Sequence, residues 1–237
     1  GWRIIGTTRS ADKAREIAAS GVEPLIWPEV DLEPLLGQIP NVLISIGPGA
    51  YGDPLLNAYE ATIARVAQGL RWVGYLSTTG VYGNHDGGWV DENTALTPTT
   101  KRGTARMQAE RRWQAIPALP LHIFRLAGIY GPGRGPFTKV KDGTARRIIK
   151  KDQVFSRIHV DDIAQALVLS LHQPTPGGIY NLCDDDPAPP QDVIAYAAAL
   201  LGVPVPPEIA IEDADMSPMA RSFYSESKKV RNDRIKQ

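Results

Sequence analysis

The sequence WVGYLSTTGVYG occupies residues 72–83. Its first six residues predict a strand, and the small and polar residues that follow predict a turn at the carboxyl end of that strand. Two further apolar runs, NVLISI at 41–46 and LHIFRL at 121–126, lie on either side along the chain. Short, nearly continuous apolar runs of this kind are typical of strands buried on both faces of a sheet.

Helical segments separate these strands. Within residues 53–69, apolar side chains recur at three- and four-residue steps, and residues 104–115 are rich in Ala, Arg, Gln and Glu. Strands that alternate with helices are joined by crossover connections, which give a parallel sheet covered on both faces. The sequence therefore predicts an α/β fold with a doubly wound, Rossmann-like, mostly parallel sheet. The first elements expected along the chain are strands over 2–8 and 22–26 and helices over 10–19 and 32–36.

The pattern changes after residue 128, where Pro and Gly become frequent. Helices are expected over 161–172 and 191–201, and a last helix is expected from residue 225 to the C-terminus. We predict a dinucleotide-binding domain over residues 1–135. Residues 136–237 are predicted to form a mixed region, partly a small substrate lobe and partly a return to the sheet.

The composition excludes several classes of protein. The chain has 26 basic and 26 acidic side chains, so its net charge of zero gives no support for a nucleic-acid or membrane-surface partner. No apolar run approaches the roughly 20 residues of a membrane helix. The single cysteine, Cys183, forms no internal disulfide, which favours a cytoplasmic location. Four scattered histidines show no ligand spacing, so no metal site is expected.

Three motifs carry a family resemblance. Residues 76–83 (LSTTGVYG), 125–134 (RLAGIYGPGR) and 159–164 (HVDDIA) resemble, in order, three segments of the extended short-chain dehydrogenase/reductases of the NAD-dependent epimerase/dehydratase type. The resemblance implies a nicotinamide dinucleotide cofactor and a small polar substrate such as a nucleotide sugar. It also implies helices that pair into a homodimer in some members.

The catalytic pair of that family is missing. In the family a helical Tyr-x-x-x-Lys supplies the general acid/base, but the helix aligned on Ala109 and Glu110 has Arg102 at the Tyr position and Arg106 at the Lys position. Arginine keeps its proton at physiological pH, so Arg102 does not exchange one with a substrate. Arg106 still offers donors to ribose hydroxyls. Thr78 matches the family's catalytic Ser/Thr, whose hydroxyl bonds a substrate carbonyl or alkoxide.

The cofactor preference is inferred from the end of the first strand. There the chain has Thr8, Arg9 and Ser10 and no acid until Asp12. Arg9 suits the 2′-phosphate of NADP, whereas NAD usually meets an Asp or Glu at this point, so NADP is favoured and NAD stays possible. No GxGxxG turn occurs in the chain. We therefore expect a first strand and glycine-rich loop, roughly twenty residues upstream, to be absent from this sequence.

Other candidate residues follow strand ends or motif positions. Gly47 and Pro48 follow a predicted strand, although a plain turn explains them as well. Further cofactor-binding candidates are Ser77, Ala127, Gly128 and Ile129. The candidates for binding substrate are Tyr82, Arg134 and His159. Aromatic packing is the alternative role for Tyr82, and a solvated basic face is the alternative for the cations near Arg134.

Two functions remain open at this point. The chain is either an NADP-preferring oxidoreductase or isomerase of the epimerase/dehydratase type with atypical catalytic residues, or a non-catalytic dinucleotide-binding sensor. The Arg102 substitution favours the sensor, and the three intact motifs favour a retained cleft.

Overall fold

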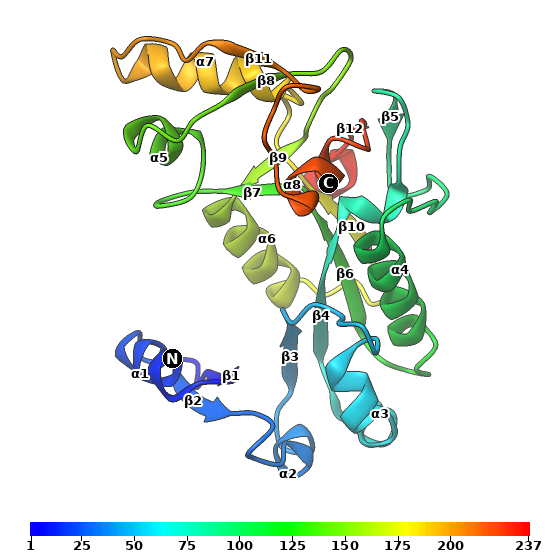
Figure 1. Cartoon of the computed structure of the whole chain (residues 1–237). Helices are drawn as coiled ribbons and strands as arrows, with labels where there is room; N and C mark the ends of the chain where they lie inside the picture. Colours follow the sequence, from blue (N-terminus) through cyan, green and yellow to red (C-terminus); the bar gives the residue numbers. More distant parts are fainter.

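The computed structural model describes all residues, 1–237, and its centre is a four-stranded parallel sheet (Figure 1). The strand order is β10–β6–β4–β3, in which β10 spans Ile179–Leu182, β6 Leu121–Leu126, β4 Trp72–Thr78 and β3 Asn41–Ile44. Every neighbouring pair is parallel. The predicted α/β fold with a mostly parallel sheet is therefore confirmed.

The first two strands form a sheet of their own. Strand β1 (Ile5–Thr8) pairs in parallel with β2 (Glu23–Ile26) across helix α1 (Ala11–Ala19). Helix α2 (Glu33–Leu36) then leads to β3, and no hydrogen bond of the ladder joins β1 to β3. The parallel sheet is thus interrupted between these two strands.

The side chains of β4 and β6 alternate between two apolar clusters. On one face, Val73, Tyr75 and Ile123 belong to the cluster beneath α3 and α4. On the other face, Trp72 and Phe124 belong to the cluster beneath α6. This period of two is the ordinary consequence of strand geometry, and burial on both faces explains why the two strands look continuously apolar in sequence.

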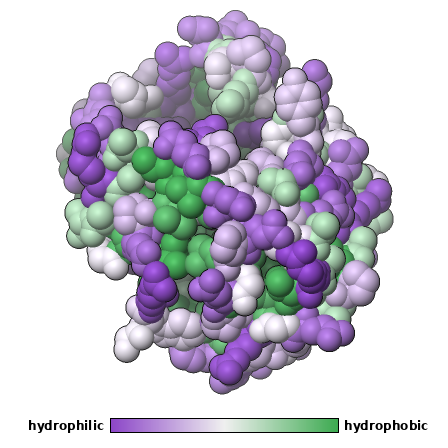
Figure 2. Space-filling view, turned by 90° about the horizontal axis from the view of Figure 1, so that it is seen from below, coloured by the Kyte–Doolittle hydropathy of each residue, from purple (hydrophilic) through white to green (hydrophobic).

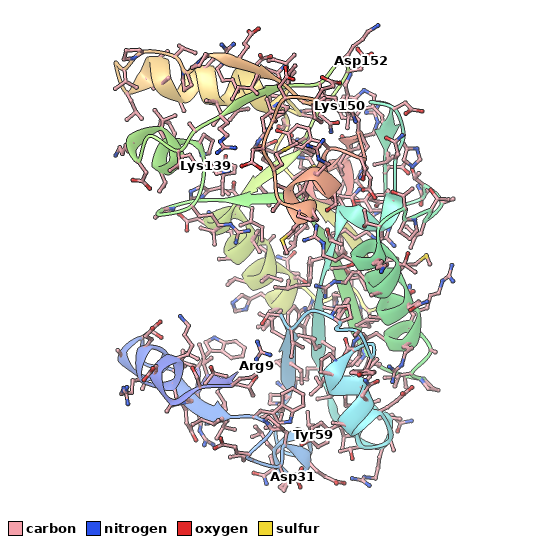
Figure 3. All side chains as sticks on the ribbon, viewed as in Figure 1. Arg9, Asp31, Tyr59, Lys139, Lys150 and Asp152 are labelled. Atoms are coloured by element: carbon pink, nitrogen blue, oxygen red, sulfur yellow. The ribbon has the colours of Figure 1, made fainter.

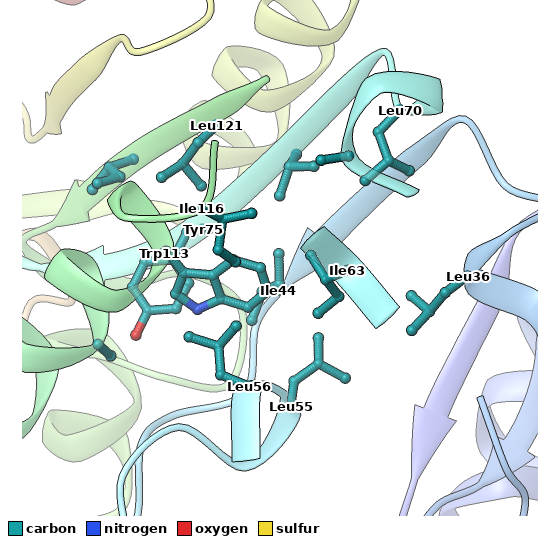
Figure 4. Close-up of a cluster of buried hydrophobic side chains, with 14 of the residues drawn as sticks. Leu36, Ile44, Leu55, Leu56, Ile63, Leu70, Tyr75, Trp113, Ile116 and Leu121 are labelled. Carbon is teal, nitrogen blue, oxygen red and sulfur yellow. The ribbon is translucent and has the colours of Figure 1, made fainter. Parts of the chain in front are cut away.

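Helices α3 (Pro54–Val66) and α4 (Lys101–Gln114) cover the first face (Figure 4). Asp53 fixes the start of α3, because its Oδ1 accepts hydrogen bonds from the backbone N–H groups of Leu55 and Leu56 at 3.0 and 3.1 Å. Its Oδ2 accepts another from Trp113 Nε1 on α4 at 3.0 Å. One buried carboxylate therefore caps one helix and ties it to the next.

Helix α6 (Val160–His172) covers the second face. Ile163 packs against the sheet there, and the Trp72 indole donates a hydrogen bond to Ser170 Oγ at 3.0 Å. A Cβ at Gly74 would lie 2.1 Å from the Trp72 ring, so only glycine lets that indole lie along the strand. The predicted helix over 161–172 matches α6 to within one residue.

The remaining elements form a lobe beyond the carboxyl ends of the strands (Figure 1). It contains three parallel two-stranded pairs, β7 (Gly128–Tyr130) with β9 (Arg157–His159), β8 (Arg147–Ile149) with β11 (Glu208–Ala210), and β5 (Trp89–Val90) with β12 (Lys229–Val230). Its helices are α5 (Pro136–Lys141), α7 (Pro190–Leu200) and α8 (Pro218–Phe223). The domain boundary at residue 135 stays a prediction.

The predicted helix from residue 225 to the C-terminus is wrong. This segment holds β12 and a short 3₁₀ turn over Asp233–Lys236 instead. The backbone of β12 pairs with β5, which lies more than a hundred residues away along the chain. This long-range contact determines the structure of the segment, and the local sequence pattern contains no sign of it.

None of the helices is long and apolar enough to cross a membrane. Seen from below, the most hydrophobic groups gather in a patch left of the centre of the surface, with hydrophilic groups around it (Figure 2). Exposed large apolar side chains occur on β3, α6 and the N-terminal segment, among them Leu43, Val168, Leu169 and Trp2.

Candidate functional site

A cleft of about 1180 Å³ lies at the carboxyl ends of β3, β4 and β6, where the C-terminal lobe meets the sheet. This edge is where doubly wound sheets bind their ligands. The cleft gathers most of the residues singled out from the sequence: Gly47, Pro48, Ser77, Thr78, Arg102, Arg106, Ala127, Gly128, Ile129 and Arg134. They come from segments up to ninety residues apart, and the parallel sheet brings them to one place.

Thr78 is the last residue of β4. Its Oγ1 accepts a hydrogen bond from the backbone N–H of Gly80 at 3.1 Å and so caps the 3₁₀ turn over Thr79–Tyr82. The hydroxyl hydrogen of Thr78 takes no part in this bond, and a hydroxyl both donates and accepts. Thr78 therefore keeps one donor that a ligand in the cleft can use.

Arg102 and Arg106 lie one turn apart on α4, so both project into the cleft from the same face of the helix. Thr100 fixes the start of this helix, because its hydroxyl oxygen accepts from the backbone N–H of Gly103 at 3.1 Å. The helix consequently begins at Lys101, three residues earlier than the pattern predicts.

Arg106 is half-buried and held by the sheet. Its Nη1 donates to Tyr75 Oη at 3.0 Å, to the Leu76 carbonyl at 2.9 Å and, more weakly, to the Ile46 carbonyl at 3.4 Å. Burial raises the pKa of the Tyr75 hydroxyl to about 12, so this partner stays neutral. No carboxylate neutralises Arg106, and its Nη2 and Nε make no hydrogen bond within the chain.

Arg102 makes a different contact. Its guanidinium lies over the ring of Phe223 on α8, with 4.5 Å between Cζ and the ring centroid. Arg102 makes no hydrogen bond and no ion pair within the chain. Contact through the flat face of the group leaves its N–H edge available.

A buried polar network lies directly behind Thr78. Glu110 of α4 forms an ion pair with Arg125 of β6 at 2.8 Å, and their side chains are only 1% and 4% exposed. Glu110 Oε1 also accepts from the Ser77 hydroxyl. The Ser77 hydroxyl is thus occupied by a protein group, although Ser77 borders the cleft.

Tyr82 belongs to the same network rather than to a substrate site. It is fully buried, its hydroxyl donates to Asn181 Oδ1 at 2.7 Å, and it accepts from Arg125 Nη1 at 3.0 Å. No atom of this phenol is left for a ligand, so the predicted substrate contact is corrected to the packing alternative. The sequence does not predict that Glu110 and Arg125 form a pair, because their spacing indicates no contact until the register of the sheet is known.

Cations dominate the charged groups around the cleft. Its lining contains two carboxylates, Asp215 and Glu226, and Glu226 is already paired with Lys228 at 2.7 Å. The cationic lining residues are Arg102, Arg106, Arg134, Lys139, Arg146, Arg157 and Lys228. A cleft with this excess of positive charge favours an anionic ligand.

Five of the predicted site residues lie outside the cleft, and the buried Tyr82 is one of them. Thr8 is the half-buried last residue of β1. Arg9 and Ser10 form the exposed turn between β1 and α1, where Ser10 caps the helix by accepting from Lys13 N at 3.3 Å (Figure 3). His159 caps α6, since its Nδ1 accepts from the backbone N–H of Asp161 at 3.2 Å. The other His159 nitrogen, Nε2, has no such role.

Two phenols do line the cleft. Burial raises the pKa of Tyr130 and of Tyr224 above the ordinary value for tyrosine. A general base needs a pKa near the working pH, and these shifts go in the opposite direction. Neither phenol therefore replaces the base lost at position 102, although either can donate a hydrogen bond.

The nicotinamide dinucleotide implied by the fold fits one part of this cleft. A Cβ at Gly47 would lie 3.1 Å from Arg106 Nη2, so the glycine keeps open the space beside two unused donor groups. Gly128, the exposed first residue of β7, likewise lines the cleft. The described residues contain no glycine-rich turn for the pyrophosphate. The part of the dinucleotide that fits this cleft is therefore its ribose and nicotinamide end. No group of three or more His, Cys, Asp or Glu side chains is placed to hold a metal ion.

Known proteins resemble this chain in sequence and in structure. No family model matches the chain. A solved structure described as a functionally unknown conserved protein from Silicibacter pomeroyi DSS is 62% identical, with a TM-score of 0.95, over 100% of this chain and 83% of that one. The chain belongs to the same family as this conserved protein. Protein YeeZ of Escherichia coli K12 is 28% identical over 221 residues, which cover 87% of this chain and 78% of YeeZ.

More distant structures identify the fold. The dTDP-glucose 4,6-dehydratase of Bacillus anthracis str. Ames, solved with NAD, has 17% identity and a TM-score of 0.73 over 99% of this chain and 80% of that chain. The UDP-glucuronic acid 4-epimerase of Bacillus cereus, also solved with NAD, has 16% identity and a TM-score of 0.69 over 95% and 89%. These likenesses confirm the predicted α/β fold with a mostly parallel, Rossmann-like sheet. Arg102 and Arg106 lie at the positions that the sequence resemblance aligns with Tyr and Lys.

Proposed function

We propose that this protein binds a nicotinamide dinucleotide, with NADP preferred, and acts on a nucleotide sugar or another small polar substrate. The observation that supports it best is the cationic cleft at the carboxyl edge of the parallel sheet, where Thr78, Arg106 and Gly128 meet. Structures with this fold include a dehydratase and an epimerase solved with NAD. A cytoplasmic location and a homodimer belong to the same proposal.

The cleft residues have separate tasks in this proposal. When bound, the nicotinamide supplies hydride transfer. Arg106 donates from Nη2 and Nε to ribose hydroxyls, while Nη1 stays anchored to the end of the sheet. Gly47 and Gly128 admit the ligand close to the backbone. Thr78 donates its hydroxyl hydrogen to a substrate carbonyl or alkoxide oxygen.

Cofactor binding is the first expected result. NADPH at about 100 times its dissociation constant should add roughly 2.7 kcal/mol to the free energy of unfolding, measured as a rise in melting temperature. NADH at the same concentration should give a smaller rise. No rise with either nucleotide would remove the proposal.

The NADP preference depends on Arg9, which is exposed and makes no hydrogen bond or ion pair within the chain. Asp12, the nearest acid, is occupied by Arg15. Arg9→Asp should reverse the preference from NADPH to NADH, because a carboxylate repels a 2′-phosphate and accepts from a 2′-hydroxyl. Nucleotide fluorescence titrations measure both affinities. Arg111→Asp, an exposed change on α4, controls for net charge and should leave the preference unchanged.

The second candidate function is a non-catalytic dinucleotide sensor. One observation favours it, namely the guanidinium of Arg102 at the position of the family's acid/base phenol. Consumption of NADPH over a panel of nucleotide sugars and aldehydes separates the two functions. Turnover with any member supports the enzyme, and a flat result with intact NADPH binding supports the sensor.

A further inference from the structure

Arg102 is an exposed cation that lines the proposed ligand cleft and has no counter-ion within the chain. No carboxylate pairs with it and no carbonyl accepts from it; its one specific contact is the Phe223 ring at 4.5 Å. Stacking covers the flat face of a guanidinium and limits its orientations, and it leaves the N–H edge without a protein partner. A fork of donors prepared in this way matches the two oxygens of a carboxylate or phosphate.

The surroundings supply no internal anion for this fork. Glu226 of the cleft is held by Lys228 and by Thr99. Asp215, the other lining carboxylate, is exposed and makes no ion pair with any cation of the chain. Arg106, one turn along α4, also lacks a carboxylate partner, so the two arginines add their fields in the same part of the cleft.

The helix places this fork where the reacting end of a ligand would lie. Arg102 occupies the position aligned with the family's acid/base Tyr, and it shares the cleft with Thr78. An alcohol or carbonyl needs a proton donor or acceptor there, which arginine does not provide. An oxyanion needs only charge-assisted hydrogen bonds, which arginine provides best.

We propose that Arg102, held against Phe223, binds a carboxylate or phosphate group carried on the end of the ligand opposite its nucleotide. This inference rests on the proposed function for the location of the ligand, and it narrows the substrate class to one with an anionic group at that end. Phe223 acts as a positioning residue, because it fixes the guanidinium without touching the anion.

Protection from an arginine reagent tests this directly. Phenylglyoxal modification is followed at Arg102 and Arg111 by peptide mass spectrometry, so that Arg111, exposed on the same helix, is an internal control. The probes are UDP-glucuronic acid against UDP-glucose, and glucuronate and glucose 6-phosphate against glucose. At about ten times the dissociation constant, an anionic probe should slow modification of Arg102 about tenfold and leave Arg111 unchanged.

The pattern across probes gives the chemistry. Protection by glucuronate alone assigns a carboxylate, and protection by glucose 6-phosphate alone assigns a phosphate. Phe223→Leu should weaken the protecting ligand about threefold, as expected for loss of one cation–π contact. Equal protection by UDP-glucose and UDP-glucuronic acid, or none by any anionic probe, would overturn the inference.

NADPH binding, measured on the same samples by melting temperature, separates this result from the proposed function. If NADPH binds and no anionic probe protects Arg102, only the anion site fails. If glucuronate or glucose 6-phosphate protects Arg102 and NADPH does not bind, the anion site stands and the dinucleotide function fails.

Discussion

Glu110→Ala is expected to lower the free energy of unfolding by about 3–5 kcal/mol, the usual cost of removing one partner from a buried ion pair. The carboxylate lies between α4 and the sheet, and it accepts two hydrogen bonds from Arg125, at 3.2 and 2.8 Å, and one from the Ser77 hydroxyl. Without it, the Arg125 guanidinium keeps only the Tyr82 hydroxyl, at 3.0 Å, as a partner. An uncompensated charge in the core makes the loss large.

Glu60→Ala is the matched control for this change. Glu60 pairs with Arg112 at 2.6 Å, but these side chains are 47% and 35% exposed. Water solvates the remaining arginine there, so the expected loss is only about 0–1 kcal/mol. Urea denaturation of the two variants measures both values. Equal losses of unfolding free energy in the two variants would show that the buried Glu110–Arg125 pair contributes no more to stability than the exposed pair.

Glu110→Ala is also expected to disturb the cleft, because of where Glu110 lies. It bonds Ser77, the neighbour of Thr78, and it lies on the helix that carries Arg106. The network therefore fixes two sides of the cleft relative to each other. This is a structural reason for the buried charge, because an apolar group of similar size would pack without setting that orientation.

Much of the sheet could be predicted from local pattern. The apolar run at 121–126 coincides with β6, and the run at 72–77 falls one residue short of β4. Strands buried on both faces are continuously apolar, so the signal is strong. The local pattern predicts too late a start for α4, since Gly103 weakens the helical signal, whereas the Thr100 cap decides where the helix begins.

Long-range contacts account for what the sequence did not predict. Lys228 Nζ donates to the Gly83 carbonyl at 2.7 Å across 145 residues, and β12 pairs with β5 in the same region. The sequence at 226–229, Glu-Ser-Lys-Lys, otherwise fits a helical segment. Ser77, Glu110 and Arg125 meet only because β4 and β6 are in register with each other beneath α4. Charged residues are mostly exposed, so a buried pair has no local signature.

Arg106→Leu is expected to weaken NADPH binding about 10- to 100-fold, the loss of one or two charge-assisted hydrogen bonds. The proposed donors, Nη2 and Nε, make no bond within the chain, whereas Nη1 holds Tyr75 and the Leu76 carbonyl. Leucine removes both the donors proposed for the ligand and the anchor to Tyr75 and Leu76. Nucleotide fluorescence titration measures the affinity, and urea denaturation measures how much stability is lost with it.

Arg106→Lys separates cofactor binding from anchoring of the helix to the sheet, because lysine is the residue at this position in the family that the sequence resembles. An ammonium group keeps the charge and three donors but loses the planar fork. It should retain NADPH binding to within about tenfold of the unsubstituted protein, while the anchor to Tyr75 and Leu76 weakens. If the leucine variant loses stability and still binds NADPH normally, Arg106 serves only the end of the sheet, and the ribose site must be sought among other residues of the cleft.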